Sequence, residues 1–316
     1  MNPDPLRYGA SLPLDSVYYP LGFPLHIATN SEHVLHAAAE SWGDYAPVFD
    51  TAPLRIRVAI SPGPAASAPP VYTGQENLML MASDPANVAA CDSARGFAFC
   101  RLSAATAAER AFTAYYFLEA MAYHLLTQLY ITPLHAACVS RDGRGVLLCG
   151  ESGAGKTTLA YACVRRGWTY ISDNESWLVR ESSPPVVLGN PYRIRFRETA
   201  GGLFPELRTA TPELHANGKM SINLKTATLA EMRVAARCQV HSLALLARGS
   251  VSAGFAPASA ETALALLLST VPMYEPRVAC AHRESLARLA ALPAVTLSYD
   301  SPGSGVAQLE ALIRQV

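Results

Sequence analysis

The chain has 316 residues, of which 50% are hydrophobic and 16% are charged, and its 25 basic and 25 acidic side chains give a formal net charge of zero. This length suits two domains, and the apolar fraction is high enough for a substantial core. Because no basic stripe accompanies the balanced charge, we expect no nucleic acid among the partners.

The first part of the chain, 1–130, is predicted to form a separate α/β domain. Ser31 is expected to cap a helix in which apolar residues repeat with helical period up to Trp42. One long, mostly buried helix is expected at 110–130. Strands are recognised by short apolar or alternating runs, and they are predicted at 23–28, 54–60, 77–81 and 96–102.

From residue 132 onward, strands alternate with helices, which predicts a second α/β domain over 131–316. Strands 134–140 and 144–149 are joined by Asp142-Gly143, a dipeptide favoured in type I′ hairpin turns. Further strands are predicted at 168–172, 222–224, 240–246 and 294–299. Helices are predicted at 261–270 and 283–291, with a last helix ending at Val316.

A complete G-x-x-x-x-G-K-[ST] motif stands between the strand 144–149 and the start of an apolar helix, which is the context that a phosphate loop requires. Its glycines let successive N–H groups turn toward one anion at a helix N-terminus. Lys156 is expected to reach the β- and γ-phosphates of a nucleotide, and the Thr157 hydroxyl to bind Mg²⁺. The predicted nucleotide-binding residues are Gly150, Glu151, Ser152, Gly153, Ala154, Gly155, Lys156, Thr157 and Thr158.

Asp173 follows the strand 168–172, one βα unit after Lys156. In a parallel sheet that strand end faces the same crevice as the phosphate loop. A carboxylate there can hold Mg²⁺ or take the proton from an attacking hydroxyl. An Asp before an Asn also commonly caps a turn, but the position favours a functional role.

Four segments together resemble the catalytic domain of HPr kinase/phosphorylase. They are His135-Ala136-Ala137, the turn Asp142-Gly143, the phosphate loop, and the segment 166–173 that ends in Asp173. The resemblance covers residues 132–180 well, and the spacing from loop lysine to aspartate is the same. It implies a P-loop kinase that uses ATP and Mg²⁺ to phosphorylate a serine-type hydroxyl.

The resemblance also implies roles for single residues. Asp173 would be the general base, Lys156 would bind ATP phosphates, and Thr157 would replace the family's serine on Mg²⁺. His135 would lie beside the site and tune Asp173 or a phosphate. From the residues alone, His135 on a largely apolar strand is equally consistent with a core histidine.

Several positions depart from the family pattern. Asn174 replaces a second aspartate, and Arg193 stands where the family has a metal-linked glutamate. Glu175 is one substitute carboxylate, and Glu198 is the predicted further metal ligand beside Thr157 and Asp173. The glycine-rich phosphorylase signature has no counterpart, so we expect a kinase only.

Two cationic residues are candidates for neutralising the transferred charge. Lys219 follows an Asn-Gly turn, and Arg195 projects from a strand of alternating arginines. Lys219 is the preferred candidate, although a solvated turn lysine has the same local sequence.

The acceptor is expected to be a small protein, a peptide or a metabolite with a hydroxyl, and the N-terminal half is expected to contact it. The family's tendency to assemble implies a homo-oligomer. The alternative is a nucleotide-binding regulatory ATPase that transfers no phosphate to an acceptor, which Asn174 and Arg193 favour.

The seven cysteines show no C-x-x-C pair and no metal-ligand spacing, and most stand in apolar runs. The start, residues 1–5, is unlike an export signal, and polar residues interrupt the longest apolar stretch, 112–130. We therefore expect a soluble protein of the reducing cytoplasm, with no membrane partner.

Overall fold

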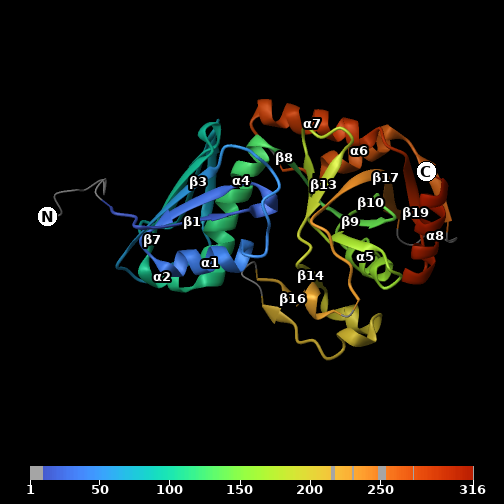
Figure 1. Ribbon diagram of the computed structural model, residues 1–316, viewed down its shortest axis with the longest axis horizontal. Helices are drawn as coiled ribbons and strands as arrows, with labels where there is room; N and C mark the ends of the chain where they lie inside the picture. The colour runs from blue at the N-terminus through green and yellow to red at the C-terminus, as the bar shows by residue number, and fades with distance from the viewer. Residues whose placement is uncertain (1–9, 215–217, 230, 248–253, 273, 316) are drawn as a thin grey trace. The chain divides into compact units, whose positions relative to one another are not determined.

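The computed structural model describes residues 10–214, 218–229, 231–247, 254–272 and 274–315, which form a mixed α/β fold with several sheets (Figure 1). Contacts divide the chain into two compact units, Met1–Leu129 and Tyr130–Val316. The predicted start 1–5, Asn217 of the Asn-Gly turn and the predicted helix end at Val316 lie outside the described residues.

The first unit contains a seven-stranded sheet in the order β1-β2-β3-β7-β6-β5-β4. Neighbouring pairs β2/β3 and β3/β7 are parallel, and the other pairs are antiparallel. The strands are β1 Leu14–Tyr18, β2 Leu25–Thr29, β3 Leu54–Ser61, β4 Val71–Gln75, β5 Leu78–Asp84, β6 Asn87–Asp92 and β7 Phe97–Ser103.

Helices pack on this sheet through buried apolar residues such as Trp42, Phe117 and Leu125. The predicted long helix is present with a π-helical turn in its middle. The helical segments are α1 Glu32–Trp42, α2 Ala104–Ala108, α3 Arg110–Thr113, the π-turn Ala114–Glu119 and α4 Ala120–Leu129. Ser31 stands at the N-cap position of α1, but the predicted cap by its side chain is wrong, because that side chain makes no capping hydrogen bond.

The second unit is built on a nine-stranded mixed sheet. Its strands are β8 Ile131–Leu134, β9 Ala136–Arg141, β10 Arg144–Cys149, β11 Thr169–Ser172, β12 Ser176–Val179, β13 Val186–Gly189, β17 Arg237–Ala247, β18 Gly254–Ala258 and β19 Ala294–Ser298. A separate small sheet consists of β14 Arg193–Phe196, β15 Glu213–Leu214 and β16 Met220–Lys225. Short 3₁₀ turns follow β14, namely η4 Glu198–Gly202 and η5 Pro205–Leu207.

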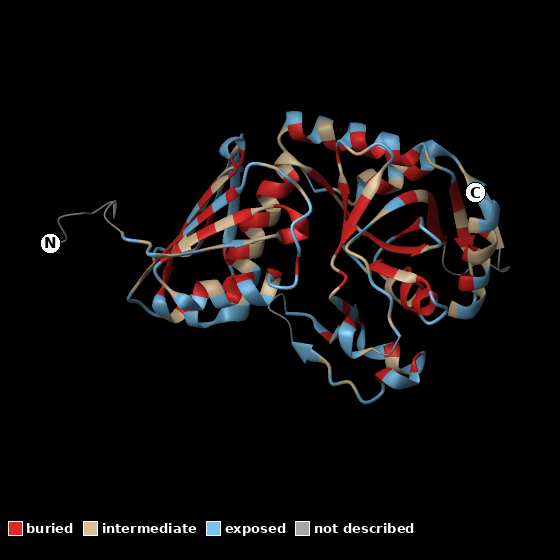
Figure 2. Cartoon of the chain, viewed as in Figure 1, coloured by how far each residue is buried: buried red, intermediate tan, exposed pale blue. Residues whose placement is uncertain are grey.

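Helices cover both faces of the large sheet (Figure 1). α5 Lys156–Val164 and α8 Pro302–Gln315 share one apolar core with residues such as Val146 and Leu297, while α6 Ala260–Ser269 and α7 Pro276–Ala290 share another with residues such as Leu147. Figure 2 shows buried residues concentrated on the strands and on the helix sides that face them. Within the described residues, no helix is long and apolar enough to span a membrane.

The predicted hairpin between β9 and β10 is confirmed. The strands pair antiparallel, with Arg141 opposite Arg144, and both turn residues have positive φ, 52° at Asp142 and 80° at Gly143. These dihedrals match the type I′ turn, whose twist suits the flanking strands.

The prediction of one continuous strand over 134–140 is wrong, because the chain bends at His135 and changes partners there. β8 pairs with β12, whereas β9 pairs with β10 and β11. α7 also begins earlier than predicted, at Pro276, because Glu275 caps it by accepting a hydrogen bond from the Val278 N–H at 3.3 Å.

Candidate functional site

The segment 150–155 links the end of buried strand β10 to the start of α5. Gly153 and Gly155 both have positive φ, +88° and +97°, and Gly155 is the N-cap residue of α5. These conformations are open to glycine and strained for other residues. The turn exposes the unpaired N–H groups at the helix N-terminus, where an anion is stabilised. The local geometry therefore suits an anion, as the motif predicts.

Tyr299 holds the loop from the side of β19. Its hydroxyl donates to the Ala154 carbonyl oxygen at 3.2 Å, and a Cβ built on Gly155 would lie 2.5 Å from the Tyr299 hydroxyl oxygen. No side chain fits at Gly155 without displacing this brace.

Gly155→Ala should therefore lower the free energy of unfolding by about 2 kcal/mol or more, because backbone strain and a steric clash act together. Gly167→Ala is the matched control, since Gly167 also has positive φ, +82°, but a Cβ added there would meet nothing within 4 Å. The control should cost only about 1–2 kcal/mol of left-handed strain. Urea unfolding of the two variants checks this, and equal losses would mean that Tyr299 yields without cost.

Lys156 is the first residue of α5 and is only 5% exposed. Its ammonium group donates to the carbonyl oxygens of Gly150 at 2.8 Å and Glu151 at 3.1 Å. Burial lowers the pKa of Lys156; nearby Cys149 opposes this shift, and the positive charge of Arg197 adds to it. A bound anion would stabilise this buried ammonium group, and the N–H donors of the loop would bind the same anion.

Asp173 lies beside this loop because of the sheet topology. β10 and β11 both pair antiparallel with β9, so they run in the same direction and end at the same edge. The Thr157 hydroxyl donates to the Asp173 main-chain carbonyl oxygen at 3.4 Å. The structure thus brings together the second half of the loop motif and the main chain of Asp173, the residue that the sequence singled out.

The Asp173 side chain is partly accessible and accepts a hydrogen bond on Oδ2 from the Arg195 main-chain N–H at 2.9 Å. Burial raises the pKa of Asp173 to about 6, and the charge of Glu175 acts in the same direction. The amide and charge of Arg195 and a hydrogen bond from Tyr170 oppose the shift. A carboxylate that titrates near neutral pH is suited to accept and release a proton.

His135 lies at the bend between β8 and β9 and is half-buried. Burial lowers its pKa, and the positive charges of Lys156 and then Lys219 lower it further. The imidazole is therefore neutral at neutral pH. The positive charge of Lys219 is thus close enough to affect the pKa of His135, and the Lys219 side chain itself is exposed.

The Thr157 hydroxyl and the Asp173 main-chain carbonyl that it contacts are oxygen groups, which suit a hard cation such as Mg²⁺. Among the described residues no three His, Cys, Asp or Glu side chains form a metal cluster, so protein ligands would be few. Mg²⁺ binds in this way when one or two carboxylates and substrate phosphates complete its shell. The negative charge of Glu175 raises the pKa of Asp173. Glu198 begins η4 and has an exposed side chain, and its role as a metal ligand stays a prediction.

Arg197 is the site residue that sequence reasoning missed. Its Nη2 donates to the Ser152 hydroxyl oxygen at 3.4 Å, and its guanidinium atoms lie 3.6–4.0 Å from the position that a Cβ on Gly153 would take. The only signal in the sequence is the alternation of three arginines from Arg193, which by itself does not distinguish Arg197 from Arg195.

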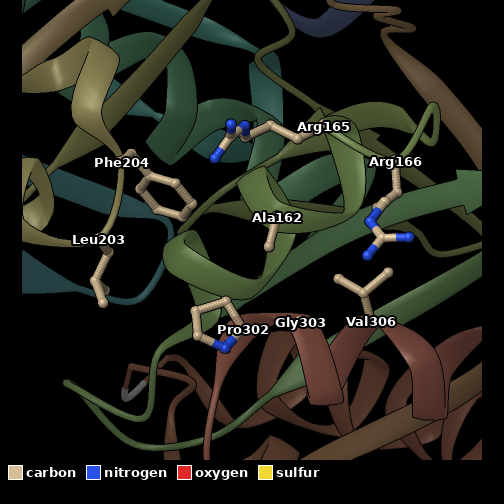
Figure 3. Close-up of a pocket in the computed structure, with 8 residues that line it drawn as sticks. All are labelled: Ala162, Arg165, Arg166, Leu203, Phe204, Pro302, Gly303 and Val306. Atoms are coloured by element: carbon tan, nitrogen blue, oxygen red, sulfur yellow. The ribbon is translucent and has the colours of Figure 1, made fainter.

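A hollow of about 380 Å³ lies elsewhere on the second unit, between the C-terminal end of α5 and the start of α8. Figure 3 shows Arg165 and Arg166 at its sides, with Phe204 and Val306 supplying apolar surface. The phosphate loop stands at the opposite, N-terminal end of α5, so this hollow contains none of the predicted site residues.

The chain matches no protein-family model and no curated protein. Among solved structures, it is similar to the HPr(Ser) kinase/phosphatase from Coxiella burnetii, with 16% sequence identity and a TM-score of 0.34. The match covers 58% of this chain and 88% of that one. This is a distant structural relationship, so the function proposed for the chain rests on its own residues.

Proposed function

We propose that the chain is an ATP-dependent kinase that transfers the γ-phosphate of ATP to a serine-type hydroxyl of a small protein, a peptide or a metabolite. One observation carries the proposal: the glycine-rich loop that encloses buried Lys156 stands beside Asp173, whose main-chain carbonyl accepts the Thr157 hydroxyl and whose carboxyl group has a raised pKa. An anion cradle and a proton acceptor at one sheet edge are the two parts that transfer to a hydroxyl needs.

In the proposed reaction, the loop N–H groups and Lys156 bind the β- and γ-phosphates. The acceptor hydroxyl gives its proton to an Asp173 carboxylate oxygen while its own oxygen bonds to the γ-phosphorus. The bond from the γ-phosphorus to the β–γ bridging oxygen breaks, and ADP leaves. When bound, Mg²⁺ would neutralise phosphate charge, with Thr157 and Asp173 as the residues to hold it and Glu198 as the further predicted ligand.

The secondary roles follow from charge. The neutral imidazole of His135 can share a hydrogen bond with a phosphate oxygen, and Lys219 can balance negative charge from the exposed side of the site. The N-terminal unit is proposed to contact the acceptor. A homo-oligomeric state and a cytoplasmic location stay predictions.

A second candidate function is a regulatory ATPase that binds nucleotide without labelling an acceptor. Asn174 and Arg193 favour it, because they stand where the family pattern has acidic residues.

Incubation of the full chain with γ-labelled ATP and a bacterial lysate tests the proposal. A kinase should place the label on an acceptor as an alkali-labile phosphoserine, and Lys156→Ala should place none there. Label that appears only as inorganic phosphate would contradict the kinase and support the regulatory ATPase.

Thr157→Ala should raise the Mg²⁺ concentration needed for half-maximal ATP binding, while Thr157→Ser should behave like the wild type, because only the hydroxyl is required. The shift should be at least the roughly 10–100-fold that the loss of an outer-shell metal partner causes. Titration of MgATP binding at several Mg²⁺ concentrations measures it. Equal losses in both variants would point to packing of the Thr157 methyl group instead.

A further inference from the structure

The segment that carries Arg197 is fixed to the helix of the phosphate loop. β14 pairs antiparallel with β16, and its alternate residues Ile194 and Phe196 are buried. The Phe196 ring packs edge-on against Tyr161 of α5 with centroids 5.0 Å apart. Because such aromatic contacts in a core are rigid, Arg197 leaves the end of β14 from a defined position relative to α5.

From that position the Arg197 side chain reaches back over the loop. Its guanidinium lies against Gly153, where the lack of a side chain makes room, and donates to the Ser152 hydroxyl oxygen at 3.4 Å. Its charge is near enough to Lys156 to lower the pKa of that lysine. The cations of Lys156 and Arg197 thus lie at one loop although they repel each other, which costs stability unless an anion is bound between them.

Arg197 forms no ion pair with a carboxylate in the part of the chain that the structure describes. Other arginines of the same unit do, since Arg165 pairs with Glu206 at 3.3 Å and Arg141 pairs with Glu310 at 2.5 Å. The remaining N–H groups of the Arg197 guanidinium have a planar arrangement that matches two phosphate oxygens at once.

We infer that Arg197 binds the terminal phosphate of the nucleotide on the phosphate loop and stabilises the charge that moves with the phosphoryl group, with Ser152 as its positioning residue. The role in transfer rests on the proposed function; the role in binding does not. Lys156 faces the β- and γ-phosphates in a phosphate loop, so a guanidinium beside Lys156 is nearer to the terminal phosphates than to the nucleoside. Arginine supplied from the same chain serves this purpose in other phosphoryl-transfer proteins.

The test compares the affinities of the full chain for MgATP and MgADP in the wild type and in Arg197→Ala. Loss of one charge-assisted contact to the terminal phosphate should weaken MgATP binding about 10–100-fold and leave MgADP binding within about twofold. Where transfer is measurable, its rate should fall by about 10²–10³-fold. Arg197→Lys should restore only part of either loss, because an ammonium lacks the planar fork.

Arg237→Ala is the matched control, because Arg237 is an exposed arginine at the start of β17, and β17 runs parallel to β10, so this end of the strand lies away from the loop. It should leave both affinities unchanged. Equal weakening of MgATP and MgADP by Arg197→Ala would mean that Arg197 only shapes the loop, and unchanged affinities would mean that it stays in solvent; either result overturns the inference. If the wild type labels no acceptor while Arg197→Ala still loses preference for MgATP, the proposed kinase fails and the inference stands.

Discussion

Replacing Lys156 with alanine should abolish measurable MgATP binding and, with it, turnover. Lys156 is the only lysine in the loop, and its ammonium already bridges the carbonyl oxygens of Gly150 and Glu151. Its removal takes away a charge-assisted contact to the phosphates and leaves these two oxygens without their donor. Calorimetric titration with MgATP and a steady-state ATPase assay measure both effects.

Two further variants separate charge from packing. Lys156→Met keeps a long apolar side chain in the buried position, so it should fold well yet bind MgATP as poorly as Lys156→Ala. Lys225→Ala removes an exposed lysine at the end of β16 and should change nothing. Normal ATP affinity in a folded Lys156→Met protein would remove the phosphate-loop interpretation altogether.

Asp173→Asn should lower the rate of phosphoryl transfer by about 10²–10⁴-fold, the usual cost of a lost acid–base group, while MgATP binding stays nearly intact. The amide keeps the size of the carboxylate and can still accept the hydrogen bond from the Arg195 main-chain N–H. It has no free lone pair of sufficient basicity for the hydroxyl proton. Single-turnover rates and MgATP affinities, measured on the same preparation, check both parts.

Other outcomes have distinct meanings. If Asp173→Asn weakens Mg²⁺ and MgATP binding together, Asp173 is chiefly a metal ligand, since a neutral amide binds a hard cation poorly. Wild-type values for both quantities would make Asp173 a turn residue. Asp142→Asn is the matched control at the β9–β10 turn, where an exposed carboxylate with φ of 52° tolerates asparagine.

The parts of the site that depend on local sequence could be predicted from it. The loop motif between β10 and α5 is local, because its glycines set the turn and its lysine opens the helix. The approach of Asp173 follows from strand order, since a strand that ends one βα unit after the loop can reach the same sheet edge. In the structure this happens through two antiparallel pairings with β9.

The rest depends on tertiary packing that leaves little trace in the sequence. Arg197 reaches the loop because Phe196 packs on Tyr161, and no spacing rule encodes that contact. The bend at His135 is hidden because both flanking strands are apolar and only their partners differ. Edge strand β4 is exposed along its whole length, so it lacks the alternation by which strands are recognised.

The most direct measurement of phosphoryl transfer follows the fate of the γ-phosphate in one reaction that contains labelled ATP and an acceptor extract. Phosphoserine on the acceptor and inorganic phosphate are quantified together for the wild type and for Asp173→Asn. We predict that the wild type yields labelled phosphoserine in excess of inorganic phosphate, and that Asp173→Asn loses the phosphoserine by at least about 10²-fold. Release of inorganic phosphate alone, at the same rate in both proteins, would contradict a kinase that uses Asp173 as its base.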